Sequence, residues 1–215
     1  SADSNPFPYQ LSETGIFESV AGHKVAPGVI EFSINSPQWS DGASAERYLA
    51  IPGEESIRMR SAAKLIPGSM FSRAVDHPRD TVLIKTLSLE LQAGDPATRQ
   101  RVETQVLHFD GRDWQAYTYE WNQEQTDAVL VDRRGKVRSI TVKDPDAPNG
   151  KRTHTWRFAA RNECIRCHNP WSEHTLAFNI AQINRTHSYG EREDNQIRTL
   201  RHINVLVDIP DDPDP

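Results

Sequence analysis

The chain has 215 residues and is mildly acidic, with 25 Lys and Arg against 30 Asp and Glu and a formal net charge of −5 at pH 7. This length suits one domain of ordinary size and allows a substantial buried core. The sequence shows no basic cluster, which argues against nucleic-acid binding, and no apolar run of the ~18 residues that span a bilayer.

Strand-like segments fill the first three quarters of the chain. They carry alternating apolar residues or β-branched and aromatic residues, and turn residues separate them. In chain order they span residues 29–34, 47–51, 81–91, 102–109, 114–121, 128–131, 137–142 and 154–158. This pattern predicts a mainly β protein of the β-rich α+β class.

Two turn signals predict antiparallel hairpins. Asp110-Gly111 separates the fourth and fifth segments, and a dipeptide of this kind is a strong hairpin signal. Residues 132–135, which end in a glycine, separate the sixth and seventh segments and predict a second hairpin.

Residues 164–168 read Cys-Ile-Arg-Cys-His, the C-x-x-C-H pattern of c-type haem attachment. The spacing puts Cys164 and Cys167 on one helical turn, where each sulfur can add across a haem vinyl group to give a thioether. His168 then supplies the proximal imidazole to the iron. The chain has only these two cysteines, so a zinc site with two Cys pairs is not expected. One covalent haem c is the prediction; a Cys-x-x-Cys disulfide or reduced dithiol is the alternative.

Short helices are expected at this motif and near the C-terminus, with the antiparallel sheet over the haem. Asn162 is placed to cap the motif helix. Residues 193–205 predict one helix with Ile197, Leu200 and Asn204 facing inward.

The C-terminal residues 208–215 are acidic and rich in proline, which is typical of a linker or tail. A single c-haem domain is therefore expected over residues 1–207, with an extended N-terminal segment. The opening residues Ser1–Asn5 read like a mature terminus. Because haem is normally attached covalently outside the cytoplasm, we expect a removed export signal and a periplasmic or otherwise extracytoplasmic location.

Short motifs stand in order along nearly the whole chain. They are residues 11–17, 36–42, 81–86, 117–122 with 125–128, 161–164, 183–185 and 195–196. The ordered set resembles a family of bacterial mono-haem c-type cytochrome domains, whose members are often fused to, or encoded near, sugar-dehydrogenase-like β-propellers. The resemblance implies an exported c-haem domain with a redox partner protein or a fused dehydrogenase domain.

A β-rich chain with C-x-x-C-H near its C-terminus is also similar in architecture to cytochrome c-prime-beta and its lysine–porphyrin cross-linked, hydroxylamine-oxidising relatives. In these proteins an antiparallel sheet covers the distal haem face, and residues 81–86 would correspond to a distal strand. The cross-linked relatives need a lysine further along that strand, where Leu87–Glu90 stand here. Lys85 is the nearby lysine, and its register does not match, which argues against hydroxylamine chemistry.

The sixth iron ligand separates electron transfer from small-molecule chemistry. Met70 lies in a Pro-Gly-Ser-Met-Phe loop suited to presenting a thioether, and His77 is the second candidate. Met59 lies in a strand, where packing is the expected role. Arg161 and Arg185 are candidates to pair with haem propionates, with a surface position as the alternative.

The leading hypothesis is an exported electron-transfer domain that relays electrons from a fused or partner dehydrogenase. The alternative is a haem enzyme or gas-binding protein with an open distal site for NO, peroxide or hydroxylamine chemistry.

Overall fold

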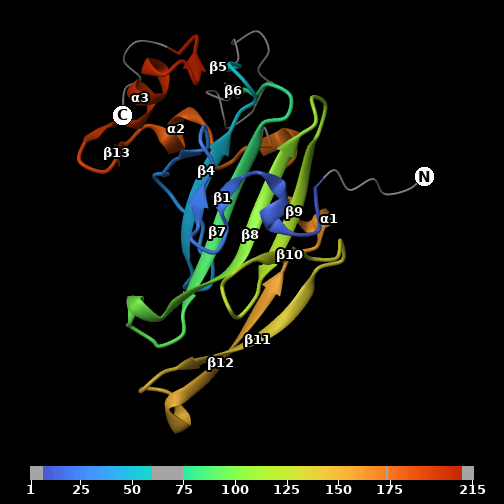
Figure 1. The fold of residues 1–215 in the computed structure, drawn as a ribbon, viewed down its shortest axis with the longest axis vertical. Coiled ribbons are helices and arrows are strands. Elements are labelled where there is room, and N and C mark those ends of the chain that lie inside the picture. Colours follow the sequence, from blue (N-terminus) through green and yellow to red (C-terminus); the bar gives the residue numbers. More distant parts are fainter. Residues whose placement is uncertain (1–6, 60–74, 173, 210–215) are drawn as a thin grey trace.

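The computed structural model describes residues 7–59, 75–172 and 174–209 (Figure 1). It is mostly β, with 41% strand and 15% helix, and its sheets are largely antiparallel. The prediction of a β-rich fold with short helices is therefore confirmed.

The strands are β1 (Phe17–Ser19), β2 (Lys24–Val25), β3 (Ile30–Glu31), β4 (Ser44–Ala50), β5 (Ile57–Met59), β6 (Val75–Asp76), β7 (Val82–Glu90), β8 (Arg99–Phe109), β9 (Trp114–Trp121), β10 (Ala128–Leu130), β11 (Lys136–Lys143), β12 (Lys151–Phe158), β13 (Thr186–Ser188), β14 (Glu193–Asn195) and β15 (Leu206–Val207). The α-helices are α1 (Arg161–Cys164), α2 (Ile180–Ile183) and α3 (Gln196–His202). The short 3-10 turns are η1 (Leu11–Thr14), η3 (Pro96–Thr98), η4 (Pro148–Gly150) and η5 (Pro170–Ser172).

The central sheet has six strands in the order β10-β9-β8-β7-β4-β3. Strand β8 pairs antiparallel with both β7 and β9. The Asp110 carboxylate closes the β8–β9 turn by accepting hydrogen bonds from the backbone N–H groups of Arg112 and Asp113, both at 2.8 Å. The first predicted hairpin is thus confirmed.

The second predicted hairpin is wrong. Strand β10 pairs with β9 in the central sheet, whereas β11 pairs with β12 in a separate two-stranded ribbon. The eight residues of β12 match β11 along its full length, which the three-residue β10 cannot do. Ile140 and Trp156 lie on the buried side of this ribbon and pack in one cluster with Leu87 of β7.

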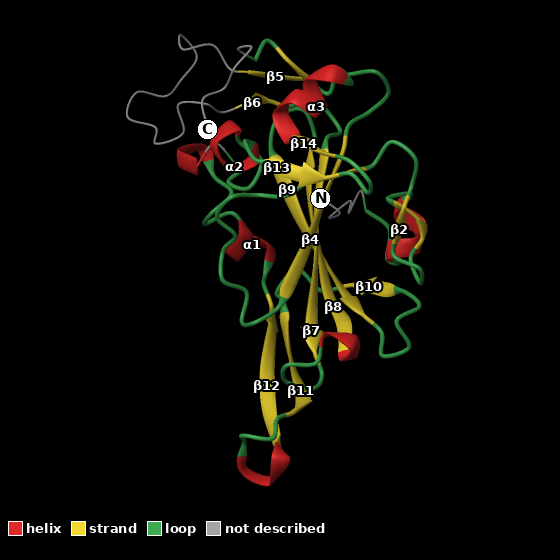
Figure 2. Cartoon of the chain, turned by 90° about the vertical axis from the view of Figure 1, so that its left-hand side faces the viewer, coloured by secondary structure: helices red, strands yellow, loops and turns green. Residues whose placement is uncertain are grey.

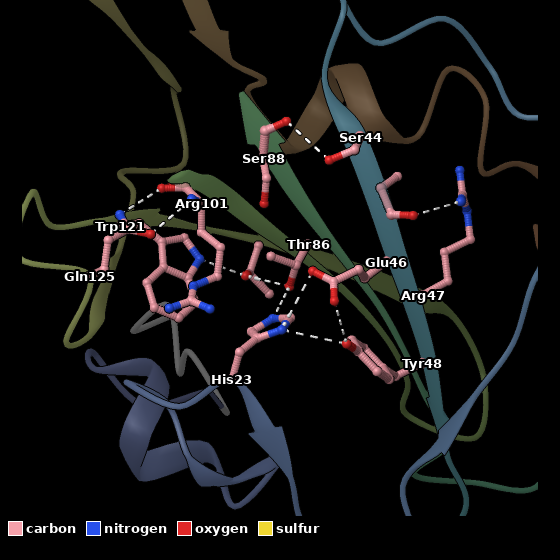
Figure 3. Close-up of polar contacts among 12 residues, drawn as sticks. His23, Ser44, Glu46, Arg47, Tyr48, Thr86, Ser88, Arg101, Trp121 and Gln125 are labelled. Atoms are coloured by element: carbon pink, nitrogen blue, oxygen red, sulfur yellow. Dashed lines mark hydrogen bonds and ion pairs between the residues drawn. The ribbon is translucent and has the colours of Figure 1, made fainter. Parts of the chain in front are cut away.

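The two faces of the central sheet are covered by different parts of the chain. Successive residues of a strand point to opposite faces, so Glu46 and Tyr48 of β4 lie on one face and Arg47 on the other (Figure 3). The N-terminal η1, β1 and β2 cover the face of Tyr48, and α1 lies on the opposite side of the sheet (Figure 2). Parity therefore assigns positions in β4, β7 and β8 to a face up to the bulge in the β7–β8 pair, where the register shifts between Leu87 and Ser88.

A polar network is buried beneath the N-terminal cover (Figure 3). His23 Nε2 lies 3.1 Å from Thr86 Oγ1, which lies 2.9 Å from Thr104 Oγ1. The Trp121 indole N–H donates to the same Thr104 hydroxyl at 2.9 Å. These bonds tie the N-terminal segment to β7, β8 and β9 on the face that points away from the cysteines.

The end of the described chain packs onto the domain. Strand β15 pairs in parallel with β5, and the Asp208 carboxylate pairs with Arg58 at 3.0 Å. Ile209 is buried in the same core as Phe178 and Leu200. The packed chain thus continues two residues beyond the boundary expected at residue 207, and the rest of the expected tail lies outside the described residues.

Two helix predictions need correction. Asn162 lies inside α1, and the cap position is Ala160, whose N–H donates to the Glu163 carboxylate at 2.9 Å. Residues 193–195 form β14, and the Asn195 side chain caps α3 by accepting hydrogen bonds from the N–H groups of Ile197 and Arg198. Ile197 and Leu200 are buried as expected, but Asn204 is exposed because α3 ends two residues before it.

Gly135 occupies a position where a side chain is excluded. Its φ is +74°, and a Cβ there would lie 2.4 Å from the Phe158 carbonyl oxygen and 2.8 Å from the Ala160 nitrogen. Gly135→Ala is therefore expected to lower the free energy of unfolding by the ~1–3 kcal/mol of a strained φ and by a further ~1–3 kcal/mol of overpacking. Urea unfolding measures the change.

Gly94→Ala is the matched control, since Gly94 has φ +77° and no atom within 4 Å of a built Cβ. This variant carries the strain without the clash. Equal losses in the two variants would show that the contact with the segment leading into α1 costs nothing.

Candidate haem site

Helix α1 and the turn after it present the C-x-x-C-H residues. The backbone N–H groups of Cys167 and His168 both donate to the Cys164 carbonyl, at 3.2 and 2.9 Å, so the helical path continues through the motif. Cys164 is half-buried, Cys167 is exposed, and both are free thiols. The local geometry therefore brings both sulfurs and the imidazole to one place, as the spacing predicts.

The motif forms one wall of a cavity of about 240 Å³. Cys164, Cys167 and His168 line this wall, and the central sheet forms the opposite wall. Further lining side chains come from the connecting segments: Phe32, Gln38, Ala159, Thr175 and Ala177. The cavity lies on the sheet face opposite to the N-terminal cover.

The sheet wall carries a polar row flanked by an apolar row. Residues directly opposite one another on β4, β7, β8 and β9 form the polar row: Arg47, Lys85, Gln105 and Thr118. The apolar row lies two residues away from the polar row on each strand. It consists of Leu49, Leu83, Leu107 and Ala116. All of these except Leu49 line the cavity.

His168 is oriented in the way that metal-bound histidines are. Its Nδ1–H donates to the carbonyl oxygen of His174 at 2.6 Å, which fixes the tautomer and leaves Nε2 to bind a metal. Burial lowers the pKa of His168 below its usual value, so the imidazole stays neutral at neutral pH. A neutral imidazole is the form that coordinates iron.

Glu103 is a buried carboxyl group on β8, two residues before the lining residue Gln105 and outside the cavity lining itself. It accepts hydrogen bonds from the Trp156 indole and from the Gln105 amide, both at 2.9 Å. Burial raises the pKa of Glu103, and burial together with Glu103 raises the pKa of the Cys164 thiol. The cavity therefore combines apolar lining with a few fixed polar groups, as small-molecule sites do.

The structure brings together some of the predicted residues but not others. Arg161 lies outside the cavity lining with its guanidinium 4.7 Å from the Tyr117 ring centroid. Arg185 also lies outside it and donates to the backbone carbonyls of Ile34 and Thr186. A propionate contact by either arginine stays a prediction.

Of the two candidate sixth ligands, the structure describes only His77. His77 packs edge-on against Trp114 at a centroid distance of 5.0 Å and is absent from the cavity lining. Met70 lies outside the described residues.

Sequence reasoning missed the polar row. Lys85 faces the cavity, and the mismatch of its register with the lysine of the cross-linked relatives stays a prediction. The signal was present in the strand pattern, because Lys85 interrupts the apolar alternation of Leu83, Leu87 and Leu89. Arg47 gave no such signal, since its position depends on the pairing of β4 with β7.

These residues fit a c-type haem. The two thiols and an imidazole with a free Nε2 lie at one wall, and the facing wall offers apolar contacts to a macrocycle. The cavity volume is just below the ~300–1,000 Å³ typical of ligand pockets, so part of a macrocycle would lie at the surface beside the exposed Cys167. In the described residues, no group of three or more His, Cys, Asp or Glu side chains is placed to hold a metal ion. A c-type haem requires one imidazole from the protein, because the porphyrin supplies four ligands.

Comparison of the chain with protein-family models, with curated proteins and with solved structures finds no match. Among the described helices, none has both the length and the apolar character needed to cross a membrane.

Proposed function

We propose that this chain is an exported mono-haem c-type cytochrome domain that acts in electron transfer. Cys164 and Cys167 would hold the haem through thioethers, and His168 would be the proximal iron ligand. Bound haem supplies a one-electron couple. The electrons would come from a fused or partner dehydrogenase in the periplasm or another extracytoplasmic compartment.

The observation that carries this proposal is the orientation of His168 within the C-x-x-C-H turn. A surface histidine that follows a disulfide or dithiol needs no hydrogen bond that fixes its ring. Here the His174 carbonyl holds Nδ1–H, and the ring lines the cavity together with both cysteines. Such a hydrogen bond to the second ring nitrogen is the usual partner of a metal-bound imidazole.

A basic surface next to the motif supports electron exchange at this place. Five arginines line a surface hollow beside α1: Arg133, Arg134, Arg157, Arg161 and Arg166, called here the arginine surface. Glu163 is the one carboxylate in this lining, and it pairs with Arg157. Exposed Ile165 and Cys167 lie in the same turn. This local charge suits an acidic redox partner, although the whole chain carries −5.

Oxidation of the ferrous holoprotein by ferricyanide tests the proposed exchange surface. If electrons leave beside the arginine surface, the rate constant should fall as ionic strength rises, because the local positive charge attracts the anion. Arg134→Glu with Arg166→Glu should slow the reaction roughly tenfold at low salt. Stopped-flow absorbance at a series of salt concentrations measures both effects.

Arg112→Glu is the control, since Arg112 lies at the exposed tip of the β8–β9 turn, and this single change of −2 in net charge is compared with Arg134→Glu and Arg166→Glu made singly as well as together. A rate constant that rises with salt, as the net charge alone predicts, would contradict exchange at the arginine surface. Equal slowing by the control would do the same.

The alternative function, a haem enzyme or gas-binding protein, is favoured by one observation. The wall that faces His168 carries Lys85 and Gln105, which are hydrogen-bond donors suited to a small polar ligand. Immediate binding of CO or NO to the isolated holoprotein would favour the haem-enzyme or gas-binding function over electron transfer.

A further inference from the structure

Two cations stand side by side on the sheet wall of the cavity. Arg47 of β4 and Lys85 of β7 are directly opposite in the antiparallel ladder. Side chains at such positions have Cβ atoms only about 4.5–5.5 Å apart, and like charges there are destabilising. Arg47 is 9% exposed and Lys85 is half-buried, so water screens this repulsion poorly.

Hydrogen bonds within the described residues use few of the donors of this pair. The Lys85 ammonium donates to the Ser40 hydroxyl at 3.3 Å, and Arg47 makes one long contact of 3.5 Å with the Ala45 carbonyl. Neither cation forms an ion pair within 4.0 Å in the described part of the chain. Burial lowers the pKa of both groups; Arg47 lowers the pKa of Lys85 further, and the Glu103 carboxylate partly offsets this.

The acidic groups nearest the cavity form no ion pair with Arg47 or Lys85. Glu103 on β8 accepts hydrogen bonds from Trp156 and Gln105 and attracts Lys85, but it forms no ion pair within 4.0 Å with either cation. Glu163 on α1 pairs with Arg157 and with the Ala160 N–H. His168 lines the same cavity, and an imidazole is either neutral or positively charged, so it supplies no anion to the pair. In the described part of the chain, two adjacent cations on the cavity wall thus lack an ion-pair partner, which leaves a position for an anion between them.

We propose that Arg47 and Lys85 together bind a single carboxylate or small oxyanion inside the cavity. Guanidinium and ammonium groups bind carboxylates through charge-assisted hydrogen bonds, and the surrounding leucines strengthen such bonds by excluding water. The anion is either a propionate of the haem or a free oxyanion beside it. This inference rests on the proposed haem attachment and goes beyond it, because it assigns a ligand-binding role to two residues outside the C-x-x-C-H motif.

The test uses ferric holoprotein and compares wild type with Arg47→Met and Lys85→Met, which keep an unbranched apolar stem and remove the charge. Sodium formate, a compact and redox-inert carboxylate, is titrated at constant ionic strength while the Soret band is followed. The resonance Raman propionate bending band is recorded without formate. Lys85→Arg is included to restore the cation.

Each source of the anion gives its own result. If the anion is free, formate shifts the wild-type Soret band, and each Met variant needs at least about tenfold more formate, because a hydrogen bond to a charged group contributes roughly 1.5–3 kcal/mol. If the anion is a propionate, formate has no effect, and the propionate band shifts in both Met variants. Lys85→Arg should behave like wild type in either case.

Two outcomes overturn the proposal. In the first, both Met variants show the same formate titration and the same propionate band as wild type. The other is a low-spin wild-type spectrum that Lys85→Met alone converts to high-spin, because the amine would then be an iron ligand and not an anion-binding group.

The surface variant Lys24→Met is the control for loss of one lysine charge, since Lys24 is 66% exposed and pairs with Glu18 at the surface. Haem content and mass are measured first, and only protein with one covalent haem enters the titrations. Absence of covalent haem overturns the proposed function. Unchanged formate and Raman behaviour in haem-loaded variants overturns the anion site alone.

Discussion

Holoprotein made with an export and haem-ligation system is expected to keep its haem through denaturation and acid–organic extraction, and the Cys164→Ser/Cys167→Ser variant is expected to lose all covalent haem. The intact mass should exceed that of the apo chain by one haem in wild type and by none in the double variant. The reason is that both thiols line the same cavity as His168 and are free to form thioethers.

The single variants separate the two bonds. Cys164→Ser and Cys167→Ser should each retain one thioether, so haem should stay attached with the absorption bands of a haem that keeps one vinyl group. Cys164 is half-buried at the cavity wall and Cys167 is exposed, so loss of the Cys167 thioether should disturb packing less. Release of haem from wild type on extraction, or its absence from the mature protein, would refute the proposed attachment.

The attachment motif and the strand-rich class were predictable because both depend on local sequence. The Cys-Ile-Arg-Cys-His run occupies five adjacent residues, and the β8–β9 hairpin is fixed by Asp110-Gly111 and its flanking alternation. The failed hairpin depended on partner choice. Residues 132–135 form a turn, but β11 finds a longer partner in β12 than in β10, and local patterns do not rank partners.

The features of the site that involve several strands could not be predicted from local sequence patterns. The sequence shows no basic cluster, yet Arg133, Arg157 and Arg166 line one surface hollow. Strand β11 carries the chain away from the turn that holds Arg133, and β12 returns it beside that turn and into α1. Arg47 and Lys85 are 38 positions apart and become neighbours through the register of β4 and β7. Positions of this kind follow from pairing and not from spacing.

The second large effect is expected at the sixth iron ligand. We expect ferrous wild-type holoprotein to bind CO slowly or not at all, because a methionine thioether from Met70 would occupy the distal position. Met70→Ala should then give a high-spin or water-ligated haem that binds CO on mixing. Its midpoint potential should fall, since a thioether favours ferrous iron and axial ligands shift haem potentials over a range of ~0.8 V.

The structure limits which described residues could be the sixth iron ligand in place of Met70. Among the described residues that line the cavity, His168 is the one imidazole and Lys85 the one amine. His77→Ala is therefore the matched control: His77 packs against Trp114 and Phe178, so its loss should lower stability and leave the haem spectrum unchanged. A low-spin spectrum that survives Met70→Ala but not Lys85→Met would assign the ligand to the amine. A wild-type spectrum that is already high-spin, with immediate CO binding, would show an open distal site and favour small-molecule chemistry over electron transfer.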